Sequence, residues 1–393
     1  MKENVSSENT EQIEEGKKTT PFIVKLILIV LIILTVLVLA YFLYGKEKVV
    51  EISSEKLSEL LNMDVNFDSY EFISGNNLEI SGMSIVTPYP QADYKKHNKY
   101  HTDWLSIKIR KIRLDNFDYQ RLIEGKQFYA SSVTIDSAEI DIYRDKTLPD
   151  PPFKHKPLWG SLLAKISTEL NVDTLYLKNS NVRYFEKSVH SDNAGRVHFA
   201  NTFATCYGIS NNAKKLKDQP ILEIDMQGDV MGISQIIAKA LIDLSSKNDA
   251  FTLSAKADGF EAVHMNRILS GVLPVTITEG QVKGIKVEMS ANENNATGTV
   301  ELEYEGMKFD LFSGDEHSKL KSFFANAAAK AIIHKENLKT NKNFRVGVIK
   351  FDRNKDRSIF NYWWKATQTG VVDAMMTDAG KLFKLDEKAK KVK

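Results

Sequence analysis

One segment decides the predicted fold, and it reads Ser132-Val-Thr-Ile-Asp-Ser-Ala-Glu-Ile-Asp-Ile-Tyr-Arg-Asp145. Apolar residues stand at every second position on both sides of the dipeptide Asp136-Ser137. Because successive side chains of a strand point to opposite faces, this alternation predicts strands with one apolar and one polar face. The short polar dipeptide is typical of a tight turn. We therefore expect two strands, 128–135 and 138–143, joined by that turn.

Similar patterns recur along the chain. Further strand pairs are expected at 172–177 with 182–184, at 275–277 with 282–289 and at 297–304 with 307–312, besides strands at 63–67, 78–85, 105–114 and 251–257. Short strands at regular spacing predict an antiparallel meander, and so a mainly β (α+β) fold. In the first pair, Thr134, Asp136, Glu139 and Asp141 should face water, opposite the isoleucines.

Accessory helices are expected where apolar residues recur at spacings of three and four. These segments are 49–61, 158–170, 233–244, 262–273, 320–334 and 360–385. The stretch 148–157 contains four prolines and cannot form a central strand or a helix interior, so it predicts a linker. The domain organisation expected is a β-rich portion at 45–147, a second at 158–312 and a helical region at 313–393.

An apolar run precedes all of these elements. Residues 22–44 are interrupted only by Lys25 and Thr35, and a helix of that length would cross a membrane. A cleavable signal peptide usually has a shorter apolar core, so an uncleaved signal anchor at 21–44 is favoured over that alternative. Residues 1–20 are polar and predict a disordered tail. The lysines around the run slightly favour a cytoplasmic N-terminus, with the bulk of the chain across the membrane.

The composition and motifs exclude several function classes. The 393 residues carry 53 Lys and Arg against 51 Asp and Glu, which does not favour nucleic-acid binding. The single Cys206 excludes an internal disulfide and a cysteine-cluster metal site. His97 and His101 have a helical metal-pair spacing but are expected in a loop, and 352–356 opens like a calcium loop without its glycine and glutamate. We expect no enzyme, no cofactor and no metal site, and a function carried by a surface.

The entry into the large domain resembles the AsmA-like family of Gram-negative envelope proteins, which is related to TamB. The likeness rests on the apolar run, on 65–67 and 78–88, on the strand pairs at 132–145 and 174–184, and on 273–285. It implies a single-pass inner-membrane protein with a periplasmic body of the repeating β-groove type, which binds or transfers phospholipid for outer-membrane and cell-envelope homeostasis. The groove candidates are Ile135, Ile140, Ile142, Leu175, Leu177, Val182, Ile285 and Val287.

Two alternatives remain open at this point. The apolar face could be a closed core rather than a groove, and the protein could be a non-catalytic assembly scaffold that binds an envelope protein without carrying lipid. The last helix is expected to place one apolar stripe toward a membrane or a partner, or to cap the sheet. Its stripe contains Phe360, Trp363, Trp364, Val371 and Met375.

Overall fold

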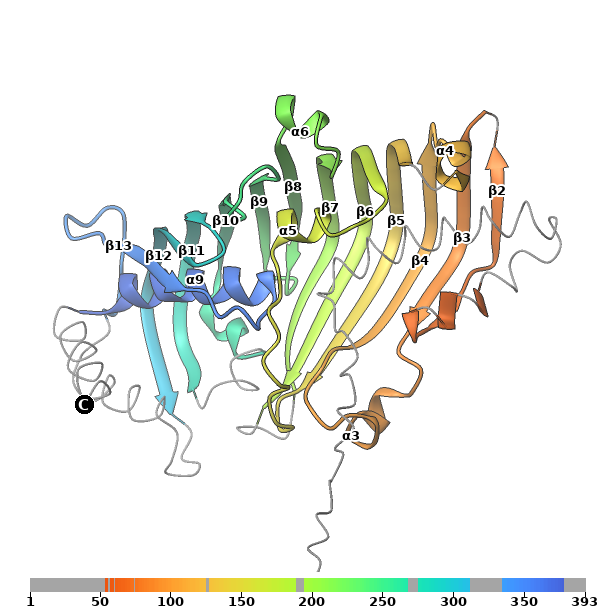
Figure 1. Ribbon diagram of the computed structural model, residues 1–393. Helices are drawn as coiled ribbons and strands as arrows, with labels where there is room; N and C mark the ends of the chain where they lie inside the picture. Colours follow the sequence, from red (N-terminus) through yellow and green to blue (C-terminus); the bar gives the residue numbers. More distant parts are fainter. Residues whose placement is uncertain are drawn as a thin grey trace, which may run out of the picture.

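The computed structural model describes residues 54–377 except 56, 60, 74, 125–126, 189–193, 268–274 and 312–333. Thirteen strands of this part of the chain form one sheet, in the spatial order β1-β3-β4-β5-β6-β7-β8-β9-β10-β11-β12-β13, with β2 paired to β3. From β2 to β13, strands that follow one another in the sequence therefore lie side by side (Figure 1). The predicted portions 45–147 and 158–312 both contribute to this one sheet.

The strands vary from 3 to 19 residues in length. They are β1 (Asp64–Asn66), β2 (Ser69–Ile73), β3 (Asn77–Val86), β4 (Trp104–Asp115), β5 (Gln127–Asp145), β6 (Glu169–Lys187), β7 (Gly195–Ser210), β8 (Ile221–Val230), β9 (Ser234–Asp243), β10 (Phe251–Glu261), β11 (Val275–Ala291), β12 (Asn295–Leu311) and β13 (Val346–Asp352).

The predicted strand pairs prove to be single long strands. Segments 128–135 and 138–143 are both parts of β5, and the pairs at 172–184, 275–289 and 297–312 are likewise the continuous strands β6, β11 and β12. Ser137 has a φ of 57° and Asn179 a φ of 49°. A single left-handed residue kinks the strand without reversing it, and its polar side chain imitates the sequence signal of a turn.

The sheet is antiparallel apart from one pair. β5 and β6 run parallel, with Ile135 opposite Leu177 and Ile142 opposite Tyr184. The predicted purely antiparallel meander is therefore wrong at this position. The cause is the proline-rich linker 148–157, which contains no helix or strand. It returns the chain to the end of the sheet where β5 began, as parallel pairing requires.

The predicted division of faces in β5 is confirmed. On the polar face, Asp136 lies between Lys111 of β4 and Lys178 of β6. On the apolar face, Ile135 lies between Ile112 of β4 and Leu177 of β6. Arg110 and Asp136 form an ion pair on the polar side. Arg183 pairs there with Asp141, at 2.5 Å, and with Glu139, at 3.2 Å.

The helices are fewer and shorter than expected among the described residues. They are the α-helices α3 (Tyr94–His97), α4 (Tyr119–Ile123), α5 (Trp159–Leu163), α6 (Lys215–Asp218) and α9 (Ile359–Met375), with 3-10 turns η1 (Gln91–Asp93) and η2 (Ala262–Met265). Residues 54–55, 57–59 and 61 are helical, as expected. Residues 320–333, and with them nearly all of the helix expected at 320–334, lie outside the described part.

Several expected helices are wrong or cut short. Segment 233–244 is the strand β9, in which Ile237 lies on the polar face with 61% of its surface exposed. Apolar residues on both faces of one strand imitate the helical spacing of three and four. Segment 158–170 ends its helix at Leu163 and becomes β6. Segment 262–273 is helical over η2 and at 266–267, and its remaining residues lie outside the described part.

The C-terminal region combines a strand with a helix. β13 joins the sheet beside β12, between the two helices expected in this region, where no strand was expected. α9 lies across the same end of the sheet (Figure 1). Residues 378–385 of the expected helix lie outside the described part. Ile359, Tyr362, Ala366, Gly370 and Ala374 form the buried stripe of α9. Phe251 of β10 contacts Tyr362 edge to face, so the helix covers the apolar face from β10 to β13.

The predicted anchor at 21–44 and tail at 1–20 lie outside the described residues. Within the described part, none of the helices has the length and hydropathy that a membrane span requires.

Two glycines set how closely α9 approaches the sheet. A Cβ added to Gly347 of β13 would lie 2.0 Å from the carbonyl oxygen of Gly370 in α9. We expect Gly347→Ala to push the helix off the strand and to destabilise the fold by about 1–3 kcal/mol, because an overpacked contact between two backbones cannot relax. Chemical denaturation followed by tryptophan fluorescence measures this change. The matched control is Gly284→Ala, where the nearest atom is 3.6 Å away. Equal stability of both variants would contradict the close contact.

The left-handed residue of β5 gives a second prediction. We expect Ser137→Val to destabilise the protein by about 1–2 kcal/mol, because a β-branched side chain opposes a positive φ. Ser137→Gly removes the same hydroxyl group but accepts that φ, so it should stay close to the wild type in its unfolding midpoint. If both variants lose the same stability, the hydroxyl group rather than the kink matters.

Candidate functional site

An apolar row crosses almost the entire sheet. In register from β3 to β13, its residues are Leu78, Leu114, Val133, Leu175, Cys206, Ile224, Ala240, Leu253, Met289, Gly298 and Ile349. Eleven strands at about 4.8 Å spacing make this row roughly 50 Å long. A parallel row lies next to it and is equally free of polar side chains. That row consists of Ile80, Ile112, Ile135, Leu177, Ala204, Met226, Ala238, Ala255, Val287, Val300 and Gly347.

The kinks keep this face apolar over the full length of the strands. In β5 the inward residues are Val133 and Ile135 before Ser137 but Ala138, Ile140 and Ile142 after it. One extra residue therefore changes which sequence positions face inward. Gly82 in β3, Asn179 in β6 and Asn201 in β7 have φ values of 63°, 49° and 47° at the same level of the sheet. Because neighbouring strands change together, their apolar sides remain aligned.

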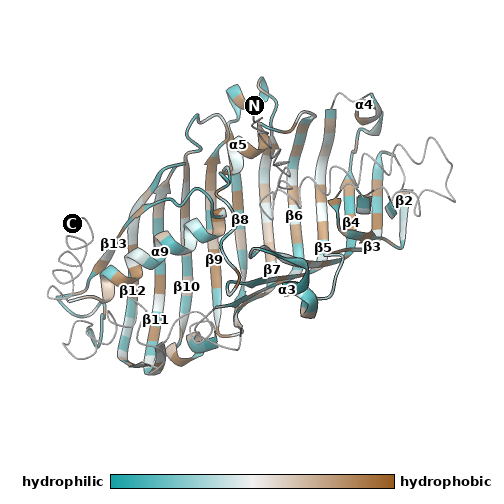
Figure 2. Cartoon of the chain, turned by 60° about the horizontal axis from the view of Figure 1, so that its bottom comes forward, coloured by the Kyte–Doolittle hydropathy of each residue, from teal (hydrophilic) through white to brown (hydrophobic). Residues whose placement is uncertain are grey.

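The eight sequence-predicted groove residues all lie on this face. Ile135, Ile140, Ile142, Leu175, Leu177 and Val182 come from β5 and β6, and Ile285 and Val287 from β11. Their burial differs along the sheet. Ile135, Ile140 and Val287 are at most 5% exposed, whereas the three residues of β6 are only half-buried. Figure 2 shows apolar segments recurring along neighbouring strands.

The two ends of the face differ from its middle. At one end α9 packs against β12 and β13, and at the other end the inward Ile80, Ile112 and Ile135 of β3 to β5 are at most 4% exposed. Between these ends, Trp159 of α5 belongs to the apolar core beside β9. In the middle, Leu175, Leu177, Ile224 and Met226 on β6 and β8 keep intermediate exposure. The middle of the face therefore offers accessible apolar side chains between covered ends.

Charged side chains terminate the apolar face at the far ends of β5 and β6. Ile142 opposes Tyr184, and the next inward pair along the strands is Arg144 with Glu186. Asp103 accepts a hydrogen bond from Nε of Arg144 at 2.9 Å, and Glu186 accepts one from Tyr184 Oη at 2.5 Å. Burial raises the pKa of Tyr184 well above its ordinary value, so its hydroxyl group remains a donor. Sequence reasoning missed this cluster because the expected strand ended at residue 143, whereas β5 continues to Asp145 and its alternation places Arg144 on the same face as Ile142.

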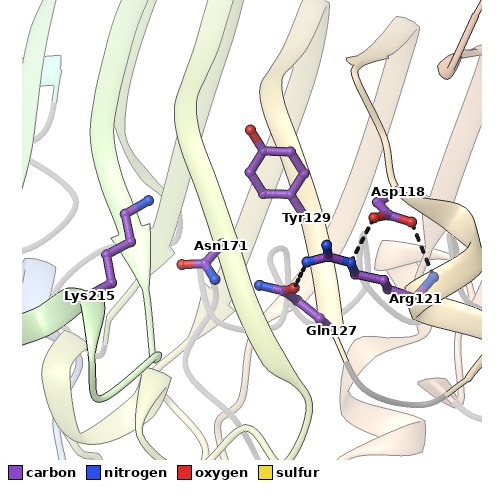
Figure 3. Close-up of a pocket in the computed structure, with 6 residues that line it drawn as sticks. All are labelled: Asp118, Arg121, Gln127, Tyr129, Asn171 and Lys215. Carbon is purple, nitrogen blue, oxygen red and sulfur yellow. Dashed lines mark hydrogen bonds and ion pairs between the residues drawn. The ribbon is translucent and has the colours of Figure 1, made fainter.

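A polar hollow lies near the first residues of β5 and β6, at the strand ends opposite the charged side chains. Asp118, Arg121, Gln127, Tyr129, Asn171 and Lys215 line about 380 Å³ between α4 and α6 (Figure 3). Both cations in it are already neutralised, since Arg121 pairs with Asp118 at 3.0 Å and Lys215 with Asp173 at 2.8 Å. This hollow shows no unbalanced charge that would select a ligand.

The expected stripe of α9 divides between two faces. Phe360 and Trp364 are 42% and 48% exposed, whereas Trp363, Val371 and Met375 pack against the core. The expectation of one shared face is therefore wrong. The covering face instead uses the small residues Ala366, Gly370 and Ala374, which sequence hydropathy undervalued.

The side chains suited to metal or nucleophilic chemistry are scattered or engaged. Among the described residues, no group of three or more His, Cys, Asp or Glu side chains is arranged to hold a metal ion. His97 stacks on Tyr89, with ring centroids 4.3 Å apart, and His101 contacts Asp150 at 2.5 Å. Cys206 stands in the apolar row of β7.

No protein-family model matches the sequence, and neither does any curated protein.

The thiol of Cys206 reports on the apolar face. Burial, with a smaller effect of Asp225, raises its pKa to about 12. At about pH 8.5 half of the ordinary thiols are ionised, so we expect iodoacetamide to react at least 100-fold faster in urea than in the folded protein. Because the unfolded chain releases this proton first, the shift should also lower stability as the pH rises above about 8.5. Mass spectrometry measures the labelling rate, and equal rates would place the thiol in water.

Proposed function

We propose that the apolar face binds the acyl chains of phospholipids, and that the protein is an inner-membrane-anchored, periplasmic lipid-binding or lipid-transfer protein of the cell envelope. The observation that carries this proposal is the unbroken apolar row from Leu78 to Ile349, whose middle residues on β6 and β8 are accessible. A closed core would need those side chains to be covered as fully as those of β3 to β5.

The energetics favour a long apolar ligand. Each methylene group removed from water contributes about 0.8 kcal/mol, so an acyl chain gains far more along a continuous row than on a scattered patch. In the second row, Ala238 and Ala255 are adjacent, and Met226 separates them from a third small side chain, Ala204. They leave room beside the larger Leu177 and Val287 for a chain to lie on the sheet.

The membrane and the compartment are proposed from the sequence. The apolar run at 21–44 suits a single-pass anchor, and the likeness to the AsmA-like family suggests the inner membrane and the periplasm. An anchored body with a lipid-binding face can take lipid directly from the bilayer that holds it.

A second candidate function is a scaffold that binds an envelope protein and carries no lipid. One observation favours it. Phe203, Tyr207 and Ile237 on the opposite face of the sheet are 38%, 44% and 61% exposed. Phe203 and Ile237 both oppose Gln227, so they lie on either side of the same β8 residue. Aromatic and aliphatic side chains in such positions are suited to a protein partner.

Photocrosslinking in cells tests the lipid proposal. With the full-length protein, we expect a photoreactive residue at Leu177 to yield phospholipid adducts detectable by mass spectrometry. The same residue at Lys178, the next position on the opposite face, should yield none. Phospholipid adducts at both positions would indicate nonspecific exposure to the membrane.

A charge substitution separates a groove from a core. We expect Leu177→Glu to abolish lipid adducts at Val182 while thermal unfolding stays cooperative, because the new carboxylate can reach water in an accessible groove. Lys178→Glu is the matched control, and it should leave adducts unchanged. In a closed core, Leu177→Glu would cost several kcal/mol and unfold the protein. An unfolded variant, together with the absence of lipid adducts in the wild type, would favour the scaffold.

A further inference from the structure

The inward side of β5 and β6 changes from apolar to charged within one step. Ile142 and Tyr184 form the last row before Arg144 and Glu186. Only 13% of the Arg144 side chain and 10% of the Glu186 side chain are exposed. The charged cluster therefore directly continues the candidate groove.

The charged cluster contains two carboxylates, Asp103 and Glu186, and each is already bound by a basic side chain. Asp103 binds Arg144, and Glu186 accepts from Nζ of Lys146 at 2.6 Å as well as from Tyr184. Their charges are thus compensated, and they leave no negative charge for further cations.

Two more lysines reach this cluster from distant parts of the chain. Lys156 belongs to the proline-rich linker, and the linker is fixed to the segment after β13, since Lys156 N donates to Lys355 O at 2.7 Å. Lys365 belongs to α9, and its Nζ donates to Gln368 at 3.0 Å. In the described part of the chain, neither lysine forms an ion pair.

Charges of both signs surround the two lysines: Arg144, Arg357, Asp103 and Asp356 act on Lys156, and Lys146 and Glu186 act on Lys365. Burial, and next to it the charge of Arg144, lowers the pKa of Lys156. Burial and the charge of Lys146 lower the pKa of Lys365, although its side chain still reaches solvent. A bound anion would relieve both effects.

The charge balance of the cluster is positive. In the described part of the chain, these four cations, Arg144, Lys146, Lys156 and Lys365, lie with three carboxylates, Asp103, Glu186 and Asp356. The next charged group outward, Arg357, contacts Asp150 at 2.6 Å and Asp356 at 3.2 Å, so its own partners already compensate it.

We propose that this cluster binds the phosphate group of a phospholipid whose acyl chains lie on the apolar face. This inference rests on the lipid-binding function proposed above and deepens it by fixing the orientation of the lipid. Ammonium groups and the Tyr184 hydroxyl group are donors suited to phosphate oxygens, and charge-assisted hydrogen bonds of this kind are strong. Lys156 and Lys365 provide the positive charge that no protein carboxylate claims.

The dimensions agree with this orientation. The hydrocarbon part of one bilayer leaflet is about 15 Å thick, half of a core of roughly 30 Å. At about 3.3 Å per residue, acyl chains that start beside Tyr184 would extend past Val182 as far as Ser180 or beyond along β6. Val182 is therefore a suitable position for a photoreactive residue.

The experiment compares two lipids that differ only in the phosphate headgroup. Full-length protein with a photoreactive residue at Val182 is placed in vesicles of phosphatidylglycerol that contain a minor fraction of diacylglycerol with the same acyl chains. We expect about a tenfold preference for the phosphatidylglycerol adduct after correction for lipid content, which corresponds to roughly 1.4 kcal/mol. Lys156→Gln combined with Lys365→Gln should bring the preference close to one while adducts of both lipids persist.

The control removes the same charge elsewhere. Lys178→Gln with Lys217→Gln changes exposed lysines outside the cluster and should retain the preference. The single variants Lys156→Gln and Lys365→Gln should each give an intermediate value, and thermal unfolding verifies that every variant is folded.

Three outcomes would overturn the assignment in distinguishable ways. Equal labelling by both lipids in the wild type would remove the phosphate site but leave the groove. Absence of any lipid adduct at Val182 would remove the groove itself. The third outcome combines equal lipid labelling with binding of inorganic phosphate, measured by phosphorus NMR, to the wild type but not to the double lysine variant. It would assign the cluster to free phosphate.

Discussion

The structure depends on keeping one face of very long strands apolar. A strand of 19 residues has to alternate without error, since a shift of one residue exchanges its two faces. Here the alternation changes phase once in each of several strands, and left-handed residues such as Ser137 and Asn179 absorb the change. Because the phase changes occur at the same level in adjacent strands, the hydrogen-bond register continues on both sides, and the apolar row stays unbroken.

The same feature explains what could be predicted from the sequence. Alternation around Ile135 and Ile142 identified the strands and their inward residues, because period two is a local property. It could not distinguish a kink from a turn, since Asp136-Ser137 is suited to both. Ile237 misled the prediction of β9 in the opposite way, because an exposed apolar residue on the polar face adds a helical spacing that only the paired strands can reveal.

The candidate site was predictable in its apolar part and hidden in its polar part. All eight groove residues follow from alternation and lie on one face. The charged cluster depends on tertiary contacts between segments more than 200 residues apart, such as Asp150 with Arg357. No local pattern announces such contacts. The small residues Gly347 and Gly370, which set the position of α9, were equally invisible to a search for apolar stripes.

One sequence feature connects the topology to the charged cluster. The proline-rich linker returns the chain to the start of β5, so β6 has to pair with β5 in parallel. The C-terminal ends of both strands, and the last inward residues on them, therefore lie side by side. Arg144 and Glu186 thus become neighbours there. The same linker is bound by Arg353, which donates to Lys156 O, and the charge of Arg144, after burial, lowers the pKa of Lys156. In an antiparallel hairpin the end of β5 would meet the start of β6, and the apolar face would end without two converging charged strand ends. Parallel pairing at this single position thus gives the face one charged end, and a lipid with one charged end could bind there in only one direction.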